Sequence, residues 1–279
     1  MLSNLKIGIV GGGNMGQALL KGFLNHALRP EQIFVSDHGR QKCEALAKTY
    51  HINTTQENAT VAQSADLLIL AIKPQQMQTV LSEIKKVYQK NSCLVLSVAA
   101  GIPTTKIIQS LGHATAPVIR AMPNTPALIQ AGITALYAAS TVTPKQKQIA
   151  QALLQTVGQT LWVAEEALMD AITALSGSGP AYFFYFLEGL IQAGQNQGLS
   201  KQEATQLTLQ TALGSIKMAL ASNQPLKTLR AQVTSKGGTT EQGILALETG
   251  HFIALLDKAI SAATQKSKVL SDQLTLGEL

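Results

Sequence analysis

The fold is decided by one stretch near the start of the chain, Ile7-Gly8-Ile9-Val10-Gly11-Gly12-Gly13-Asn14-Met15-Gly16. Four apolar residues, typical of a buried strand, lead into glycines at positions 11, 13 and 16, and a helical pattern follows directly. In such a turn Gly11 permits the tight bend, Gly13 lets the backbone approach a diphosphate, and Gly16 allows the helix to pack closely on the strand. Because free N–H groups at a helix N-terminus favour anions, we predict a dinucleotide-binding turn rather than a purely structural one.

The first half of the chain continues as an alternation of strands and helices. Helical patterns, such as Met15–His26 and Arg40–Tyr50, separate further apolar runs of strand length, which are Ile33–Ser36, Leu67–Ile72 and Leu94–Val98. This alternation is typical of βαβ units, and the runs Pro117–Arg120 and Ile133–Ala138 extend the predicted sheet. We therefore predict an α/β fold whose first domain, residues 1–163, is a Rossmann-type doubly wound parallel sheet.

The second half carries helical signals, and its strand patterns stop at about Ala164. These helices hold more apolar surface than a small free-standing bundle can bury, so we predict that residues 164–279 form an all-α domain that associates with a second copy. The expected helices are Pro180–Gln197, Lys201–Ala221, one that starts near Thr239, and His251–Val269.

Two local signals set the expected starts of two of these helices. Ser200 with Glu203, and Thr239 with Gln242, have the spacing of capping boxes, and each pair is expected to open a helix. We expect the tail after Leu270 to be loosely ordered.

Composition and charge restrict the class of protein. The 279 residues are 46% hydrophobic but only 4% aromatic, so the core is expected to consist of Leu, Ile, Val and Ala. The net charge is +6 and the pI about 9.3, yet the basic residues are dispersed, which favours small anionic ligands over nucleic acid. Cys43 and Cys93 lack metal-ligand spacing, so we expect free thiols and no metal site.

Two further features of the sequence bear on the cellular location of the protein. No charged segment followed by an apolar one precedes the first strand, and no apolar stretch approaches the ~20 residues that span a bilayer. We expect a cytoplasmic protein that binds neither membrane nor nucleic acid.

The nature of the dinucleotide depends on the residues after the second strand. Asp37 lies 21 residues after Gly16, where a carboxylate would hold the adenosine ribose hydroxyls and favour NAD. His38 and Arg40 follow at once and could instead accept a 2′-phosphate, although a solvated loop is an alternative for both. The choice between NADPH and NADH therefore stays open at this point.

The remaining residues limit the chemistry. The helix 180–197 contains no Lys, whereas β-hydroxyacid dehydrogenases of similar layout use a Lys there as acid–base group. Reduction of a protonated imine yields a neutral amine and needs no strong acid, so an imine suits this chain better than a carbonyl. Two clusters rich in Gly, Ser and Thr, residues 176–180 and 235–240, are candidates for carboxylate binding at helix N-termini, with plain helix capping as the alternative.

Taken together, these segments resemble the 1-pyrroline-5-carboxylate reductases over almost the whole chain. The resemblance rests on ordered motifs: Gly8–Gly16, Ala71-Ile72-Lys73-Pro74-Gln75, Ala99-Ala100-Gly101-Ile102, Arg120–Pro126, Asp170–Tyr182 and Gly237-Gly238-Thr239-Thr240.

The resemblance implies an NADPH- or NADH-dependent reduction of 1-pyrroline-5-carboxylate to L-proline, with hydride transfer to the C=N carbon. It implies that Thr240 hydrogen-bonds the ring nitrogen, that Glu166 lies near bound proline, and that residues 164–279 also bind substrate. The substrate carboxylate would be held by Ser235, Gly237, Gly238 and Thr239. The cofactor would be bound by Val10, Gly11, Gly12, Gly13, Asn14, Met15, Asp37, Asn58, Ala71, Lys73 and Ala99.

The resemblance also implies interlocked homodimers, which the family often assembles further into decamers. Lys236 departs from the family pattern, because it replaces the usual Pro of the Ser-Pro-Gly-Gly loop, and we expect an altered substrate affinity. Two alternatives stay open: a reductase of another cyclic imine, and a nucleotide-sensing protein without turnover.

Overall fold

The computed structural model describes residue 2 and residues 4–276. The chain forms two compact units, one comprising Met1–Ser178 with Ala262–Leu279 and the other Gly179–Ser261. This division differs from the predicted boundary after residue 163, because α7 (Leu168–Ile172) and the end of α12 (Phe252–Leu276) pack with the sheet unit.

The first unit is built on one sheet of eight strands within the described residues. In spatial order they are β3 (Asn53–Thr55), β2 (Ile33–Ser36), β1 (Ile7–Val10), β4 (Leu67–Leu70), β5 (Leu94–Ser97), β6 (Val118–Met122), β7 (Gly132–Ala138) and β8 (Gly158–Trp162). All neighbours are parallel except β6 and β7, which pair antiparallel. The predicted doubly wound sheet is confirmed, whereas β3, β8 and the reversed direction of β7 were not predicted.

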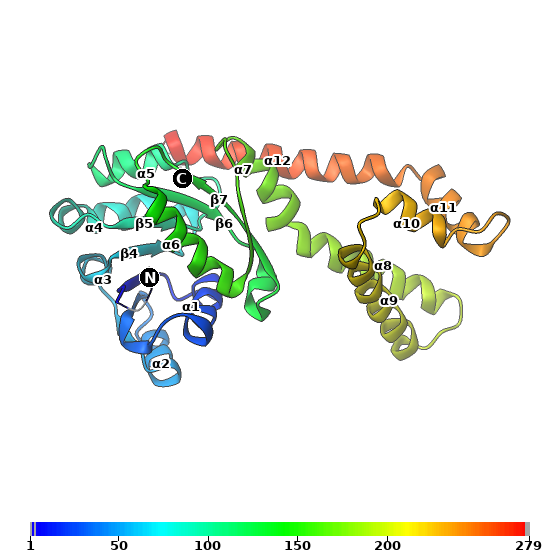
Figure 1. The fold of residues 1–279 in the computed structure, drawn as a ribbon, viewed down its shortest axis with the longest axis horizontal. Coiled ribbons are helices and arrows are strands. Elements are labelled where there is room, and N and C mark those ends of the chain that lie inside the picture. The colour runs from blue at the N-terminus through cyan, green and yellow to red at the C-terminus, as the bar shows by residue number, and fades with distance from the viewer. Residues whose placement is uncertain (1, 3, 277–279) are drawn as a thin grey trace. The chain divides into compact units, whose positions relative to one another are not determined.

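Helices cover both faces of this sheet, because successive strand residues point to opposite sides (Figure 1). Ile7 and Ile9 pack with α1 (Asn14–His26), α2 (Arg40–Tyr50) and α6 (Pro144–Leu154). Val10 packs on the other face with α3 (Asn58–Ser64), α4 (Met77–Lys90) and α5 (Thr104–Leu111). Burial of each large aliphatic side chain contributes about 1.5–3 kcal/mol, so the two cores hold the strand ends in place.

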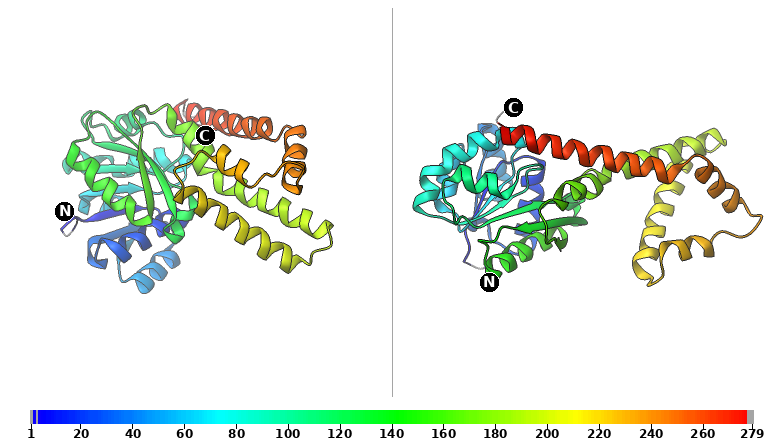
Figure 2. Two further views of the ribbon diagram at one scale, coloured as in Figure 1. Left: turned by 45° about the vertical axis from the view of Figure 1, so that its right-hand side comes forward. Right: turned by 90° about the horizontal axis from the view of Figure 1, so that it is seen from above.

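The second unit consists of helices: α8 (Gly179–Asn196), α9 (Lys201–Ala221), α10 (Leu226–Gln232), α11 (Thr239–Thr249) and the first part of α12. The helices α8 and α9 lie side by side (Figure 2). Large apolar side chains are exposed on this unit, among them Phe183, Phe184, Tyr185, Leu207, Leu209, Leu213 and Ile216.

One of the two predicted capping boxes is confirmed. Ser200 Oγ accepts from the Glu203 N–H, and Glu203 accepts from the Ser200 N–H at 2.9 Å. The Thr239–Gln242 box was wrong, because Gly238 is the N-cap and Thr239 is already the first residue of α11.

The expectation of a loose tail after Leu270 was also wrong. Helix α12 continues to Leu276, and Ser271 Oγ donates to the Gly101 carbonyl at 2.5 Å. Residues 277–279 lie outside the described residues. In the described part of the chain, no helix combines the length and apolarity needed to cross a membrane.

Candidate functional site

A pocket of about 340 Å³ lies at the carboxyl ends of β1, β2 and β4. The strand order reverses between β1 and β4, and ligands of open α/β sheets bind at such switch points. Seven of the predicted cofactor residues line the pocket: Val10, Gly11, Gly13, Asp37, Asn58, Ala71 and Lys73.

The glycine turn has the shape that a diphosphate requires. Gly11 has φ +102°, and a Cβ there would collide with the Ala71 carbonyl oxygen. A Cβ at Gly13 would meet no atom within 4 Å, so the space above this residue is open. Gly13 is also the N-cap of α1, where no side chain caps the helix. The residues present therefore fit the diphosphate of a dinucleotide.

Asp37 is held by three donors from its own chain. Its Oδ2 accepts from the Gly12 N–H at 3.0 Å and from Lys42 Nζ at 2.9 Å, and its Oδ1 accepts from the Gly39 N–H at 3.0 Å. Burial, the largest single effect, raises the pKa of Asp37, but the bonds from Lys42, Gly39 and Gly12 outweigh it, and the pKa lies below its ordinary value. The carboxylate is therefore ionised near neutral pH.

Asn58 is fixed by two side chains on other elements. Its Oδ1 accepts from Ser36 Oγ at 2.7 Å, and its Nδ2 donates to Glu83 Oε2 at 2.6 Å. Asn58 is buried, so these bonds set the direction of its amide. One amide hydrogen and one lone pair remain for a ligand.

The other predicted cofactor residues do not line this pocket. The Gly12 N–H is occupied by Asp37, while Asn14 and Met15 lie in the first turn of α1. Ala99 is 3% exposed and belongs to the core beneath α4 and α5.

The sequence analysis missed several residues that line this pocket: Ser36, Lys42, Ile72, Gln76 and Val80. It named His38, which also lines the pocket, only as an alternative acceptor of a 2′-phosphate. Ser36 and Ile72 could have been found, because residues at the carboxyl end of a parallel strand face this edge of the sheet. Lys42, five residues beyond Asp37 on α2, carries no signal of its own in the sequence.

Glu166 joins a polar cluster in the sheet unit. Its carboxylate accepts from the Thr104 N–H and Thr104 Oγ1, both at 2.8 Å, and lies 3.6 Å from Arg120. Arg120 is 4% exposed and also lies 3.7 Å from Asp170, which accepts from Ser267 Oγ at 2.7 Å. Glu166 therefore caps the N-terminus of α5, since Pro103, the N-cap residue, provides no side-chain bond.

The predicted carboxylate site lies in the helical unit, between α10 and α11. Gly237 has φ +72°, and its N–H donates to Glu241 Oε2 at 2.7 Å. A Cβ at Gly238 would lie 2.5 Å from Ser235 Oγ, so the Ser235 side chain would have to move for any other residue to fit there. Side chains of Ser235, Thr239 and Thr240 are exposed. The Gly237 amide, just before the N-cap of α11, thus already binds one carboxylate, that of Glu241.

The cluster at residues 176–180 contains the start of α8 at Gly179, but the chain before it is already helical. Residues Thr173–Gly177 form a π-helical turn directly after α7, and the Ser178 N–H donates to the Thr173 carbonyl at 2.8 Å. Because the preceding residues are already helical, this cluster lacks the free amides expected of an anion site.

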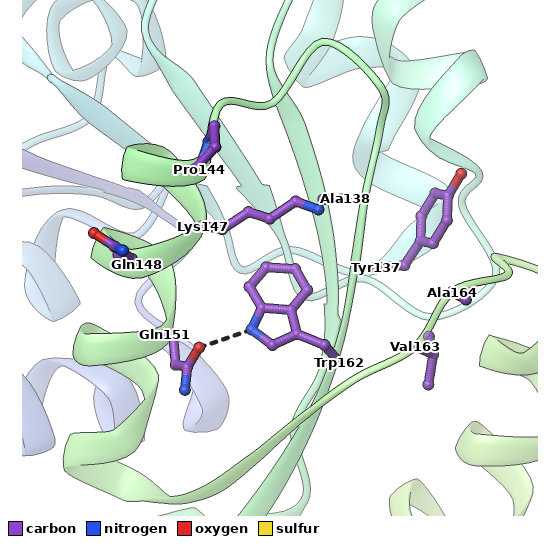
Figure 3. Close-up of a pocket in the computed structure, with 9 residues that line it drawn as sticks. All are labelled: Tyr137, Ala138, Pro144, Lys147, Gln148, Gln151, Trp162, Val163 and Ala164. Carbon is purple, nitrogen blue, oxygen red and sulfur yellow. Dashed lines mark hydrogen bonds between the residues drawn. The ribbon is translucent and has the colours of Figure 1, made fainter.

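A second pocket, of about 350 Å³, lies between α6 and the ends of β7 and β8 (Figure 3). Lys147 Nζ lies 5.6 Å from the centre of the Trp162 ring, and Trp162 Nε1 donates to Gln151 Oε1 at 2.8 Å. None of the predicted site residues lines this pocket. In the part of the chain that is described, no three His, Cys, Asp or Glu side chains are grouped to hold a metal ion.

Comparison with known proteins finds two family models in the chain. Residues 166–270 match pyrroline-5-carboxylate reductase dimerisation, and residues 6–101 match NADP oxidoreductase coenzyme F420-dependent. The two matches fall on the helical part of the chain and on the dinucleotide pocket, respectively.

Whole-chain relatives agree with these matches. The pyrroline-5-carboxylate reductase of Pseudomonas aeruginosa is 41% identical over 98% of this chain and 99% of its own. A pyrroline-5-carboxylate reductase structure from Coxiella burnetii aligns with a TM-score of 0.89 at 40% identity, covering 96% of this chain and 98% of the other. A pyrroline carboxylate reductase of Plasmodium falciparum with NADP bound aligns with a TM-score of 0.88 at 31% identity, covering 97% of this chain and all of the other (100%).

Proposed function

The chain belongs to the pyrroline-5-carboxylate reductase family, and on that premise we propose that it reduces 1-pyrroline-5-carboxylate to L-proline with NADPH or NADH as donor. The observation that carries the proposal is the pocket at the β1–β4 switch point, where an open glycine turn, Asp37, Asn58 and Lys73 meet. The bound nicotinamide would supply a hydride to the C=N carbon.

The proposed roles of the chain's own residues are binding and orientation. Thr240 hydrogen-bonds the ring nitrogen, while Ser235 and the amides of Gly237 to Thr239 hold the substrate carboxylate. In support, the Gly237 N–H already donates to the Glu241 carboxylate, so the start of α11 is suited to a carboxylate group. Substrate would displace Glu241 from that amide. Positioning contributes most of the rate in a reaction of this kind, and no nucleophile is required.

We propose that Glu166 lies near the product and acts indirectly, by holding the loop between β5 and α5. The carboxylate fixes Thr104, and this loop carries Ala99, proposed to line the path to the nicotinamide. Glu166 would then be a positioning residue.

We also propose a homodimer formed through the helical unit, assembled further into decamers. The exposed apolar side chains of α8 and α9 support a second copy as the partner. Two buried free thiols, Cys43 and Cys93, suit the reducing conditions of the cytoplasm, where we propose that the protein works.

The test is absorbance at 340 nm with purified protein, 1-pyrroline-5-carboxylate and either NADPH or NADH. Oxidation of either donor that depends on the imine is the expected result. If the protein binds dinucleotide but oxidises neither donor, while a six-membered cyclic imine restores oxidation, the substrate assignment is wrong. If the protein turns over none of the imines, the result would favour the alternative of a nucleotide-sensing protein without turnover.

A further inference from the structure

The choice between NADH and NADPH depends on how many acceptor sites Asp37 has left for a ribose. An ionised carboxylate offers about four lone-pair sites. Three of them are occupied by Gly12, Gly39 and Lys42. A carboxylate that selects NADH does so by accepting from the ribose hydroxyls, and Asp37 has about one site left for them.

Lys42 lies beside the carboxylate that would face the ribose, at the lining of the same pocket. Its Nζ is 2.9 Å from Asp37 Oδ2, and it lines the same pocket as Gly13 and Asn58. Its stem lies beside the glycine turn, since a Cβ at position 12 would be 3.4 Å from Lys42 Cδ. An ammonium has three N–H donors, and Asp37 takes one of them. The side chain is 45% exposed, so the remaining donors can reach a ligand.

The charge of the pair also favours a phosphate. A lone Asp37 carboxylate would repel a 2′-phosphate, but the ion pair with Lys42 is neutral and keeps two ammonium donors unoccupied. Arg40, a second cation on α2, donates to Glu44 at 2.8 Å, has an 81% exposed side chain and does not line the pocket. Lys73 also lines the pocket, but it follows β4, whereas Lys42 is the lysine paired with the Asp37 carboxylate.

We propose that Lys42 is the specificity-determining residue for the cofactor: its ammonium, held by Asp37, binds the 2′-phosphate of NADPH. This inference rests on the proposed function, because it takes the pocket to bind a nicotinamide dinucleotide. It follows that the protein binds NADPH more tightly than NADH although an Asp directly follows β2.

The experiment is calorimetric titration with adenosine 2′,5′-bisphosphate and adenosine 5′-monophosphate, which differ only in the 2′-phosphate. The unmodified protein is expected to bind the bisphosphate at least about tenfold more tightly, the effect of one hydrogen bond between charged groups. Lys42→Met keeps the aliphatic part of the side chain and removes the charge, so it should abolish that difference. The affinity for the monophosphate should stay within about twofold of that of the unmodified protein. Lys42→Arg should retain most of the difference.

Controls separate the possible outcomes. Lys48→Met, an exposed lysine in the last turn of the same helix, should change neither titration. Equal binding of both nucleotides by the unmodified protein, or loss of the preference in Arg40→Met instead of Lys42→Met, overturns the proposal. If neither nucleotide nor NADH binds, the dinucleotide pocket itself fails, and with it the proposed function. Imine-dependent oxidation of NADH by the unmodified protein tests the reaction independently of the 2′-phosphate.

Discussion

Asp37 shows how a single side chain combines a structural and an electrostatic role. It links the glycine turn, through Gly12, to the start of α2, through Gly39 and Lys42. Each of these bonds favours the ionised form, so the acid–base behaviour of the residue is coupled to the stability of the first unit.

We predict that Asp37→Asn lowers the free energy of unfolding at pH 7 by about 1–3 kcal/mol, because an amide cannot accept from all three donors. The pKa of the folded carboxylate lies below its ordinary value of 3.8. Its stabilisation is therefore present above pH 3.8 and disappears as the pH falls through the lower, folded pKa. Urea unfolding as a function of pH should show the variant and the parent converging in acid. A constant difference at every pH would contradict this account.

Two glycines of the turn should respond differently to the same substitution. Gly11→Ala is expected to cost several kcal/mol in stability, because φ is +102° and the new Cβ meets a backbone carbonyl. Gly13→Ala should leave the melting temperature nearly unchanged, since nothing lies within 4 Å, yet weaken NADPH binding by filling the space proposed for the diphosphate. Thermal melting and calorimetry on both variants provide the comparison. Tight NADPH binding by Gly13→Ala would place the diphosphate elsewhere.

Thr240 is the residue for which we propose the most direct contact with the reacting ring. We predict that Thr240→Ala lowers kcat by at least about tenfold, the effect of one hydrogen bond to a charged group, and leaves dinucleotide affinity nearly intact. The side chain is exposed in the described chain, so its loss should not affect folding. Steady-state kinetics with a parallel NADPH titration measure both quantities. Thr239→Ala is the matched control on the same turn, and unchanged turnover in Thr240→Ala would remove Thr240 from the mechanism.

At the scale of elements, a buried polar cluster connects α5, β6, α7 and the end of α12. Arg120 of β6 lies at its centre between Glu166 and Asp170, and Ser267 of α12 completes it. A buried guanidinium needs these partners, because an unpaired charge in a low-dielectric interior is strongly unfavourable. The cluster therefore explains why the last part of α12 belongs to the sheet unit.

We predict that Ser267→Ala destabilises the protein by about 1 kcal/mol, because the residue is only 6% exposed and its hydroxyl donates to Asp170. Ser261→Ala on the same helix is the control, since that side chain is exposed and should tolerate the change within about 0.5 kcal/mol. Urea unfolding of the two variants makes the test. Equal stability of both would mean that the hydroxyl contributes nothing to the attachment of α12.

At the scale of the whole molecule, the helical unit has too little core to account for its composition. Phe184 on α8 is 62% exposed and Leu209 on α9 is 49% exposed. Many other large apolar side chains of this unit are also exposed. Exposed apolar surface of this extent is typical of an interface, and residues 166–270 match a dimerisation model.

We predict that Phe184→Glu combined with Leu209→Glu converts the protein from dimer to monomer, because each would place an unpaired charge in the proposed interface. Size-exclusion chromatography with light scattering measures the mass directly. Gln202→Glu, an exposed polar position near the start of α9, serves as the control and should remain dimeric. A monomeric parent protein would refute the interface.

Features that depend on local order along the chain could be predicted from the residues alone. The strand Ile7–Val10, the glycine turn and helix α1 follow from apolar periodicity and from backbone angles that only neighbouring residues influence. The same reasoning failed for β8, an edge strand with only two large apolar residues, Leu161 and Trp162, and for the direction of β7, which no local pattern encodes.

Only the tertiary structure decided which side chains meet. Asn58 meets Ser36 across 22 residues, Thr104 meets Glu166 across 62, and Ser271 meets Gly101 across 170. Even the contact between Asp37 and Lys42, which are close in sequence, depends on the direction in which α2 runs from the sheet. Such contacts arise from the packing of elements on the two faces of the sheet, because a hydrogen bond requires a defined distance and direction that sequence spacing does not supply.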